Sequence, residues 1–149
     1  MRLVRLIALL FVHAASAHAQ PLPPPRVALG FTAGTTAGMS LRLPARGLTS
    51  AVAMLGVDGN DTPVLRLRAQ REIPMSGSPL HGLLAGGAYA GGPVPPDPRG
   101  WTGGLSFAAG VGFYRSRFDV ALEALPTVRL VGGREAWLDA AFTLRVALF

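Results

Sequence analysis

The chain has 149 residues, enough for one domain; half of them are hydrophobic and only 15% are charged. Soluble globular domains carry roughly 25% charged residues, so this composition predicts a surface that charge does not cover. All 14 basic residues are arginines, against 8 acidic residues, and they are dispersed singly rather than in runs interleaved with aromatics, which disfavours nucleic-acid binding. The absence of cysteine excludes disulfides, thiolate metal sites and a lipidated N-terminal cysteine.

The first 19 residues have the three parts of a secretory signal peptide. Arg2 and Arg5 form a basic start, an apolar run follows from Leu6 to Val12, and the small residues at the end predict cleavage after Ala19. The apolar run is too short to span a bilayer, although a membrane anchor is the alternative interpretation. Residues 20–25 are proline-rich and predict a short extended lead-in.

From residue 26 onward, segments of alternating apolar and polar residues are separated by Gly, Pro, Asp, Asn and Ser. Alternation with a period of two indicates β-strands, and the spacing is typical of tilted strands in a membrane barrel. No segment is a convincing helix. We therefore predict an all-β fold, an eight-stranded antiparallel up-and-down transmembrane β-barrel over residues 26–149. Its predicted strands cover residues 26–34, 36–43, 48–57, 63–73, 80–91, 101–114, 118–131 and 137–149.

Two of these segments do not reveal which face is apolar. In residues 48–57, Val52 and Met54 oppose two alanines, and in residues 80–91 leucine, glycine and alanine occupy both faces. Glycines weaken a strand and are typical of bulges or curvature. Residues 92–100, with four prolines, predict the longest irregular loop.

The polar faces of the strands indicate which way the apolar faces point. A soluble exterior would carry many Lys, Glu and Gln residues, yet most positions on the polar faces are Ala, Gly, Ser or Thr. Small residues suit the interior of a barrel of about eight strands, which is only wide enough for side chains to fill it. We therefore expect the apolar faces to meet lipid, which requires a closed sheet because lipid offers the backbone no hydrogen bonds.

The charges on the polar faces balance, four arginines against four acids. An unpaired charge in a nearly dry interior is costly, so this balance predicts an internal ion-pair network. Asp119 and Arg145 are equidistant from residue 132 in the last predicted hairpin, which predicts that they pair. The alternative is a set of ordinary solvated charges on an open sheet. The predicted network comprises Arg42, Arg66, Arg68, Glu72, Asp119, Glu123, Asp139 and Arg145.

Four aromatic residues fall near predicted strand ends: Tyr89, Trp101, Tyr114 and Trp137. Tyrosine and tryptophan are enriched where a membrane meets water. Their positions predict a thin aromatic girdle.

The signal peptide, the eight alternating segments and the terminal Phe149 together resemble the small outer-membrane barrels of the outer-membrane protein A and X type. The resemblance implies a bacterial outer-membrane location, contact with outer-membrane lipid and lipopolysaccharide, and insertion by the barrel assembly machinery. Phe149 would be the C-terminal assembly signal, although it shares the parity of the polar residues Arg145 and Thr143. We expect a monomer.

No cofactor motif, metal-ligand spacing or carboxylate cluster is evident, so we expect a non-enzymatic barrel with a structural or surface-interaction role and a filled interior without a sizeable pore. One alternative is a lipid-modifying barrel enzyme, which would need His81 beside Ser78 or Ser106. Another is a soluble lipocalin-like carrier, which would place Leu29, Phe107 and Phe142 around a ligand.

Overall fold

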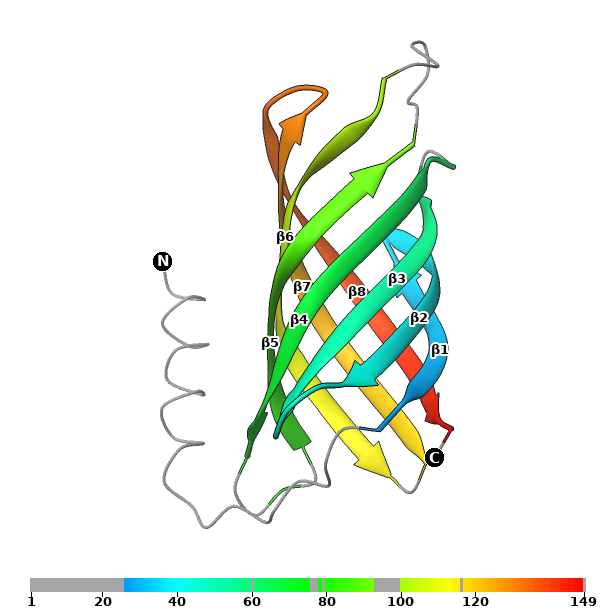
Figure 1. The fold of residues 1–149 in the computed structure, drawn as a ribbon, viewed down its shortest axis with the longest axis vertical. Coiled ribbons are helices and arrows are strands. Elements are labelled where there is room, and N and C mark those ends of the chain that lie inside the picture. Colours follow the sequence, from blue (N-terminus) through cyan, green and yellow to red (C-terminus); the bar gives the residue numbers. More distant parts are fainter. Residues whose placement is uncertain are drawn as a thin grey trace.

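A computed structural model describes residues 26–59, 61–75, 78, 80–92, 100–115 and 117–148. In these residues eight antiparallel strands follow one another in sequence order and close into a barrel (Figure 1). Each strand lies within two residues of a predicted segment, so the predicted all-β, eight-stranded up-and-down barrel is confirmed. The strands are β1 (Ala28–Gly34), β2 (Thr36–Pro44), β3 (Thr49–Asp58), β4 (Pro63–Pro74), β5 (Leu80–Gly91), β6 (Thr102–Arg115), β7 (Phe118–Val131) and β8 (Glu135–Ala147).

Pairing between β1 and β8 closes the barrel, from Ala28 opposite Ala147 to Gly34 opposite Ala141. We call the end where β1 begins and β8 finishes the lower end, and the other the upper end, as drawn in Figure 1. The upper end carries the β1–β2, β3–β4, β5–β6 and β7–β8 connections. Among the described residues, no helix is long and apolar enough to cross a membrane.

Several predicted features lie outside the described residues. They are the signal peptide over residues 1–19 with its cleavage after Ala19, the lead-in over residues 20–25, the terminal Phe149, and residues 93–99 of the predicted long loop.

The last hairpin sets the register of β7 against β8. Gly132 and Gly133 have φ values of 80° and 127°, a backbone region that glycine enters without steric penalty. The turn places Asp119 directly opposite Arg145, as the position of the predicted hairpin requires.

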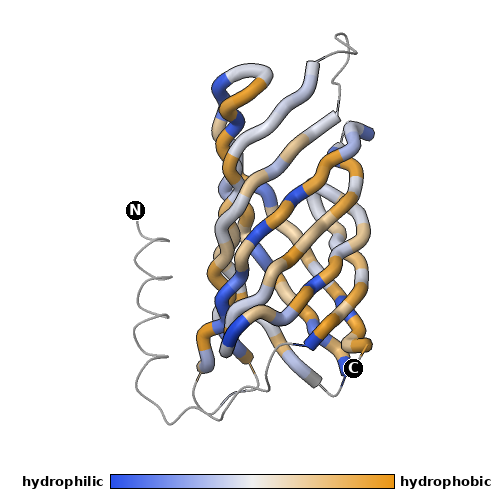
Figure 2. The backbone as a smooth tube through the Cα atoms, in the orientation of Figure 1, coloured by the Kyte–Doolittle hydropathy of each residue, from blue (hydrophilic) through white to orange (hydrophobic). Residues whose placement is uncertain are grey.

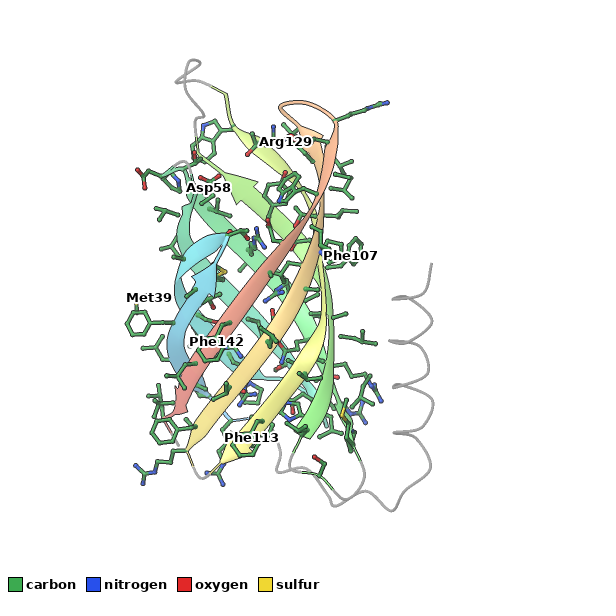
Figure 3. All side chains as sticks on the ribbon, turned by 180° about the vertical axis from the view of Figure 1, so that it is seen from behind. Met39, Asp58, Phe107, Phe113, Arg129 and Phe142 are labelled. Carbon is green, nitrogen blue, oxygen red and sulfur yellow. The ribbon has the colours of Figure 1, made fainter. Side chains whose placement is uncertain are left out.

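The strands turn large hydrophobic side chains outward. Phe31, Leu122 and Leu138 are 68%, 58% and 70% exposed, and hydrophobic and hydrophilic residues alternate along the strands (Figure 2). Met39 and Phe107, labelled in Figure 3, are also exposed on the outer surface. The predicted outward direction of the apolar faces is therefore what the barrel has.

Not every apolar side chain points outward. Val52 and Met54 on β3, Leu83 on β5 and Leu125 on β7 are all 2% exposed and lie inside. Leu125 packs against Ala108 and Ala141 in a small apolar cluster within the barrel. The interior is therefore polar but includes apolar filling, which settles the facing of residues 48–57.

Paired glycines explain the facing of β5. His81 and Tyr89 are buried, and their register partners on β6 are Gly112 and Gly104. A Cβ added at Gly104 would overlap the carbonyl oxygen of Val128 and lie 2.9 Å from Cε1 of Tyr89, and one added at Gly112 would overlap the imidazole of His81. Glycine on β6 therefore makes room inside the barrel for each ring of β5.

The predicted aromatic girdle is wrong for two of its four members. Tyr89 is 7% exposed and faces inward, and the hydroxyl of Tyr114 donates to Glu72 in the interior. Trp137 is half-buried, because its indole Nε1 donates to Asp139 at 2.9 Å. Trp101 alone of the four is strongly exposed, at 65%. Proximity to a strand end did not reveal that three of these rings have polar partners or space inside the barrel.

Candidate functional site: the charged interior and the upper pocket

All eight residues of the predicted ion-pair network are buried in the barrel interior, each at most 6% exposed. Four different strands supply these residues. β4, β7 and β8 each contribute more than one, and β2 contributes Arg42. They form two kinds of arrangement, a dense group near the lower end and two separate pairs above it.

The lower group is centred on Asp119. Its Oδ2 lies 3.0 Å from Nη1 of Arg42 and 3.1 Å from Nη1 of Arg145. Arg42 also pairs with Oε1 of Glu72 at 3.0 Å, and Nε of Arg145 donates to Ser40 at 2.9 Å. Two guanidinium groups therefore face two carboxylates, so the charge of this buried group is balanced. We call these residues the lower cluster.

Tyr114 and His81 complete the lower cluster. The hydroxyl of Tyr114 accepts from Arg42 and donates to Glu72. The ring of Tyr114 stacks on His81, with centroids 4.4 Å apart and an interplanar angle of 10°. His81 is fully buried, and neither ring nitrogen has a hydrogen-bond partner among the described residues.

Two further ion pairs cross the barrel from β4. Nη2 of Arg68 contacts Oε2 of Glu123 at 2.9 Å, and Nη2 of Arg66 contacts Oδ2 of Asp139 at 2.7 Å. Arg66 also donates to Thr36 at 3.1 Å. Both arginines use only Nη2 in these contacts, and their Nε and Nη1 atoms have no partner among the described residues.

Above Arg66 the interior opens into a pocket of about 340 Å³ at the upper end, which we call the upper pocket. Its lining includes the buried residues Arg66, Thr62 and Tyr89, and its rim includes the exposed residues Gly59 and Glu135. Trp137 forms part of the wall. The ring of Trp137 meets that of Tyr89 edge to face, with centroids 5.8 Å apart, and Arg129 lies 5.4 Å from the ring centroid of Trp137.

Sequence reasoning did not single out the upper pocket. Arg66 and Asp139 were predicted to face inward, but Thr62, Tyr89 and Arg129 were not predicted to join them. The signal that finds Tyr89 is its glycine partner Gly104 across the β5–β6 pairing. The signal for Trp137 is its position two residues before Asp139, on the same face of β8.

The serine and histidine candidates do not meet. Ser106 pairs with Gly87 and His81 pairs with Gly112, so the two lie six residues apart along β6, about 20 Å at the rise of a strand. The Ser78 hydroxyl accepts from the backbone N–H of Leu80 at 3.1 Å. No hydrogen bond joins His81 to either serine within the described ranges. Nor do three His, Cys, Asp or Glu side chains gather there as metal ligands.

No protein-family model, curated protein or solved structure matches this chain. Its function is therefore inferred from its own side chains.

Proposed function

We propose that this protein is an integral β-barrel of the bacterial outer membrane, with a structural or surface-interaction role and an interior filled by side chains. The observation that carries the proposal is the inverted arrangement of its side chains. Large hydrophobic residues are exposed on all eight strands, while paired arginines and acids are buried inside. A water-soluble protein of this size has the opposite arrangement.

Seven of the eight strands have lengths suited to a bilayer, with 9 and 10 residues in β2 and β3, whereas β1 has 7. β4 to β8 have 12 to 14 residues, and a tilted strand needs about 9–11 residues to cross the hydrocarbon layer. Closure by β1 and β8 pairs the sheet edges, which lipid requires because it offers the backbone no hydrogen bonds. Trp101, exposed just before β6 at the upper end, suits the interface between lipid and water.

The proposal extends to the export and assembly of the chain. The signal peptide predicted over residues 1–19 supports export from the cytoplasm. The partners of the barrel would be outer-membrane lipid, lipopolysaccharide and the barrel assembly machinery, with Phe149 as the assembly signal. We assign the interior no catalytic role, because the side chains proposed for catalysis lie far apart or buried without partners.

The lipocalin-like alternative has the wrong facing. It needs Leu29, Phe107 and Phe142 around an internal ligand, whereas these side chains are 39%, 45% and 48% exposed on the outer surface. Its interior would also be apolar, whereas four arginines are buried here.

Membrane insertion is tested by one pair of variants on β7. Leu122→Arg and Leu130→Arg introduce the same charge at positions that are 58% and 57% exposed. Leu122 lies well within the strand, whereas Leu130 lies beside the upper end. In a membrane, arginine costs about 2–4 kcal/mol at the bilayer midplane and about 0–1 kcal/mol near the interfaces.

We expect Leu122→Arg to reduce the folded fraction in lipid vesicles strongly and Leu130→Arg to reduce it little. Folded and unfolded forms are distinguished by their gel-electrophoretic migration with and without heating. In a separate measurement, the wild-type protein should fractionate with outer membranes. Equal behaviour of the two variants, together with recovery of wild-type protein in the soluble fraction, would exclude a membrane barrel.

A further inference from the structure

The upper pocket has the construction of a ligand site. It is open at a rim that includes Gly59 and Glu135, while three polar residues of its lining, Arg66, Thr62 and Tyr89, are 3%, 4% and 7% exposed. Its volume of about 340 Å³ is at the small end of the range of about 300–1,000 Å³ for ligand sites.

Several polar groups of this lining have no partner among the described residues. The hydroxyls of Tyr89 and Thr62 and the Nε and Nη1 atoms of Arg66 are buried without a hydrogen bond to any described residue. Buried polar groups are nearly always hydrogen-bonded in folded proteins. These groups offer two hydroxyls, which donate and accept, and guanidinium N–H groups, which only donate.

Both arginines that line the upper pocket are already paired with an acid, which disfavours an anionic ligand. Arg66 is neutralised by Asp139 at 2.7 Å, and Arg129 lies 3.4 Å from Glu135. Asp58, the fifth charged group of the lining, accepts from the backbone N–H of Thr62 at 3.1 Å. An anion would find no uncompensated cation, and a cation would meet the unpartnered N–H groups of Arg66.

An aromatic wall stands beside these hydrogen-bonding groups. Tyr89 and Trp137 both line the pocket and meet each other edge to face, and aromatic rings pack well against apolar C–H groups. A sugar has C–H faces together with hydroxyls that both donate and accept. We therefore propose that the upper pocket binds a neutral sugar, of a size close to a single ring.

Two sources present this chemistry: a free sugar, or the terminal unit of a glycan on the cell surface. A surface glycan reaches the pocket only if the barrel lies in the outer membrane with its upper end outside the cell, which rests on the proposed function, whereas sugar binding by the folded barrel does not. The two proposals can therefore fail separately.

The test uses the folded full-length barrel in detergent, with the Trp101→Phe substitution so that Trp137 is its only tryptophan. Glucose, galactose, mannose and N-acetylglucosamine are titrated against tryptophan fluorescence, with saturation-transfer NMR as a second readout. Glucuronate and glucosamine provide a negatively and a positively charged sugar of similar shape. We expect saturable binding of at least one neutral sugar, with weaker binding of both charged sugars.

Variants locate the site. Tyr89→Phe removes one unpartnered hydroxyl and should weaken binding about tenfold, the effect of losing one hydrogen bond of typical strength. Thr62→Val should weaken it similarly. Ser106→Ala is the matched control: the Ser106 hydroxyl is also buried without a partner among the described residues, but Ser106 does not line the upper pocket, so binding should be unchanged.

The proposal is overturned if no neutral sugar of the panel gives saturable binding, or if a charged sugar binds more tightly than the neutral ones. It is also overturned if the Tyr89→Phe and Thr62→Val variants bind sugar as tightly as the protein without these substitutions. Titration with the core oligosaccharide released from lipopolysaccharide distinguishes the sources. Tighter binding of the oligosaccharide than of its component sugars supports a surface glycan, and equal binding supports a free sugar. Sugar binding by a barrel that does not fractionate with membranes would refute the proposed location alone.

Discussion

The lower cluster and the upper pocket are built from the same kinds of side chain but differ in how their charged groups are connected. In the lower cluster Asp119 contacts two arginines, and Tyr114 bridges Arg42 and Glu72. In the upper pocket Arg66 uses one nitrogen and leaves two without partners. Both regions keep buried polar atoms without a partner among the described residues, such as Nη2 of Arg145 and Oε2 of Glu72 in the lower cluster. The difference teaches that one barrel interior can hold a dense charge network at one end and, at the other, unpartnered groups that line an open pocket.

The largest loss of stability is expected from a substitution at the centre of the lower cluster. Asp119→Asn leaves the buried guanidinium groups of Arg42 and Arg145 with less negative charge to balance them. Removing one partner of a buried ion pair costs about 3–5 kcal/mol. Urea unfolding of the barrel in lipid vesicles should show this loss, while sugar binding by the protein that still folds stays unchanged. The expected loss in the free energy of unfolding is about 3–5 kcal/mol. A measured loss below about 1 kcal/mol would contradict a supporting role for Asp119.

The cross-barrel pair of Arg68 and Glu123 gives the next effect. Glu123→Gln should destabilise the barrel by about 3 kcal/mol because it leaves Arg68 buried with an unpaired charge. The double variant Arg68→Met, Glu123→Met removes both charges and should be more stable than Glu123→Gln alone. Unfolding midpoints of the single and double variants check this. If the double variant were less stable than Glu123→Gln, the pair would stabilise the barrel by more than charge balance.

Overpacking at the lower end gives a smaller effect. Gly112→Ala directs a methyl group into the imidazole of His81, and overpacking of this kind typically costs about 1–3 kcal/mol. Adding His81→Ala should restore much of the loss. Gly59→Ala at the upper rim is the control, because a Cβ there meets nothing within 4 Å, and it should unfold like wild type.

The smallest effect is expected at the rim of the upper pocket. Glu135→Gln removes the partner of Arg129, but the side chain of Glu135 is 60% exposed, and exposed ion pairs contribute about 0–1 kcal/mol. Unfolding in urea should change little, and any change should shrink as salt is added. A loss as large as that of Asp119→Asn would show that rim charges support the fold as the buried ones do.

Alternation along the chain predicted the strands, their order and the inward facing of the network, because a period of two is a local property of each strand. It also predicted Asp119 opposite Arg145, because a tight hairpin fixes the register of its two strands. It did not predict that Arg66 meets Asp139 or that Arg68 meets Glu123. These partners lie on strands that are not neighbours, and which residues meet across a barrel depends on strand tilt and stagger, which no single strand encodes.

The inward facing of Val52 and Met54 was equally hidden. A hydrophobic side chain is stable against lipid or within a packed interior, so its own chemistry does not choose between them. The glycines of β6 carry more information than their polarity suggests, since Gly104 and Gly112 mark where Tyr89 and His81 enter the interior.

The seam between β1 and β8 is bridged from within by Arg145, whose Nε on β8 donates to Ser40 on β2, behind the small residue Gly30 of β1. Unzipping the first strand from the last would therefore also pull Arg145 from its hydroxyl acceptor and disturb its contact with Asp119. Fraying at the seam is coupled to loss of internal charge pairing, so the wall of the barrel should come apart in a single cooperative step rather than strand by strand.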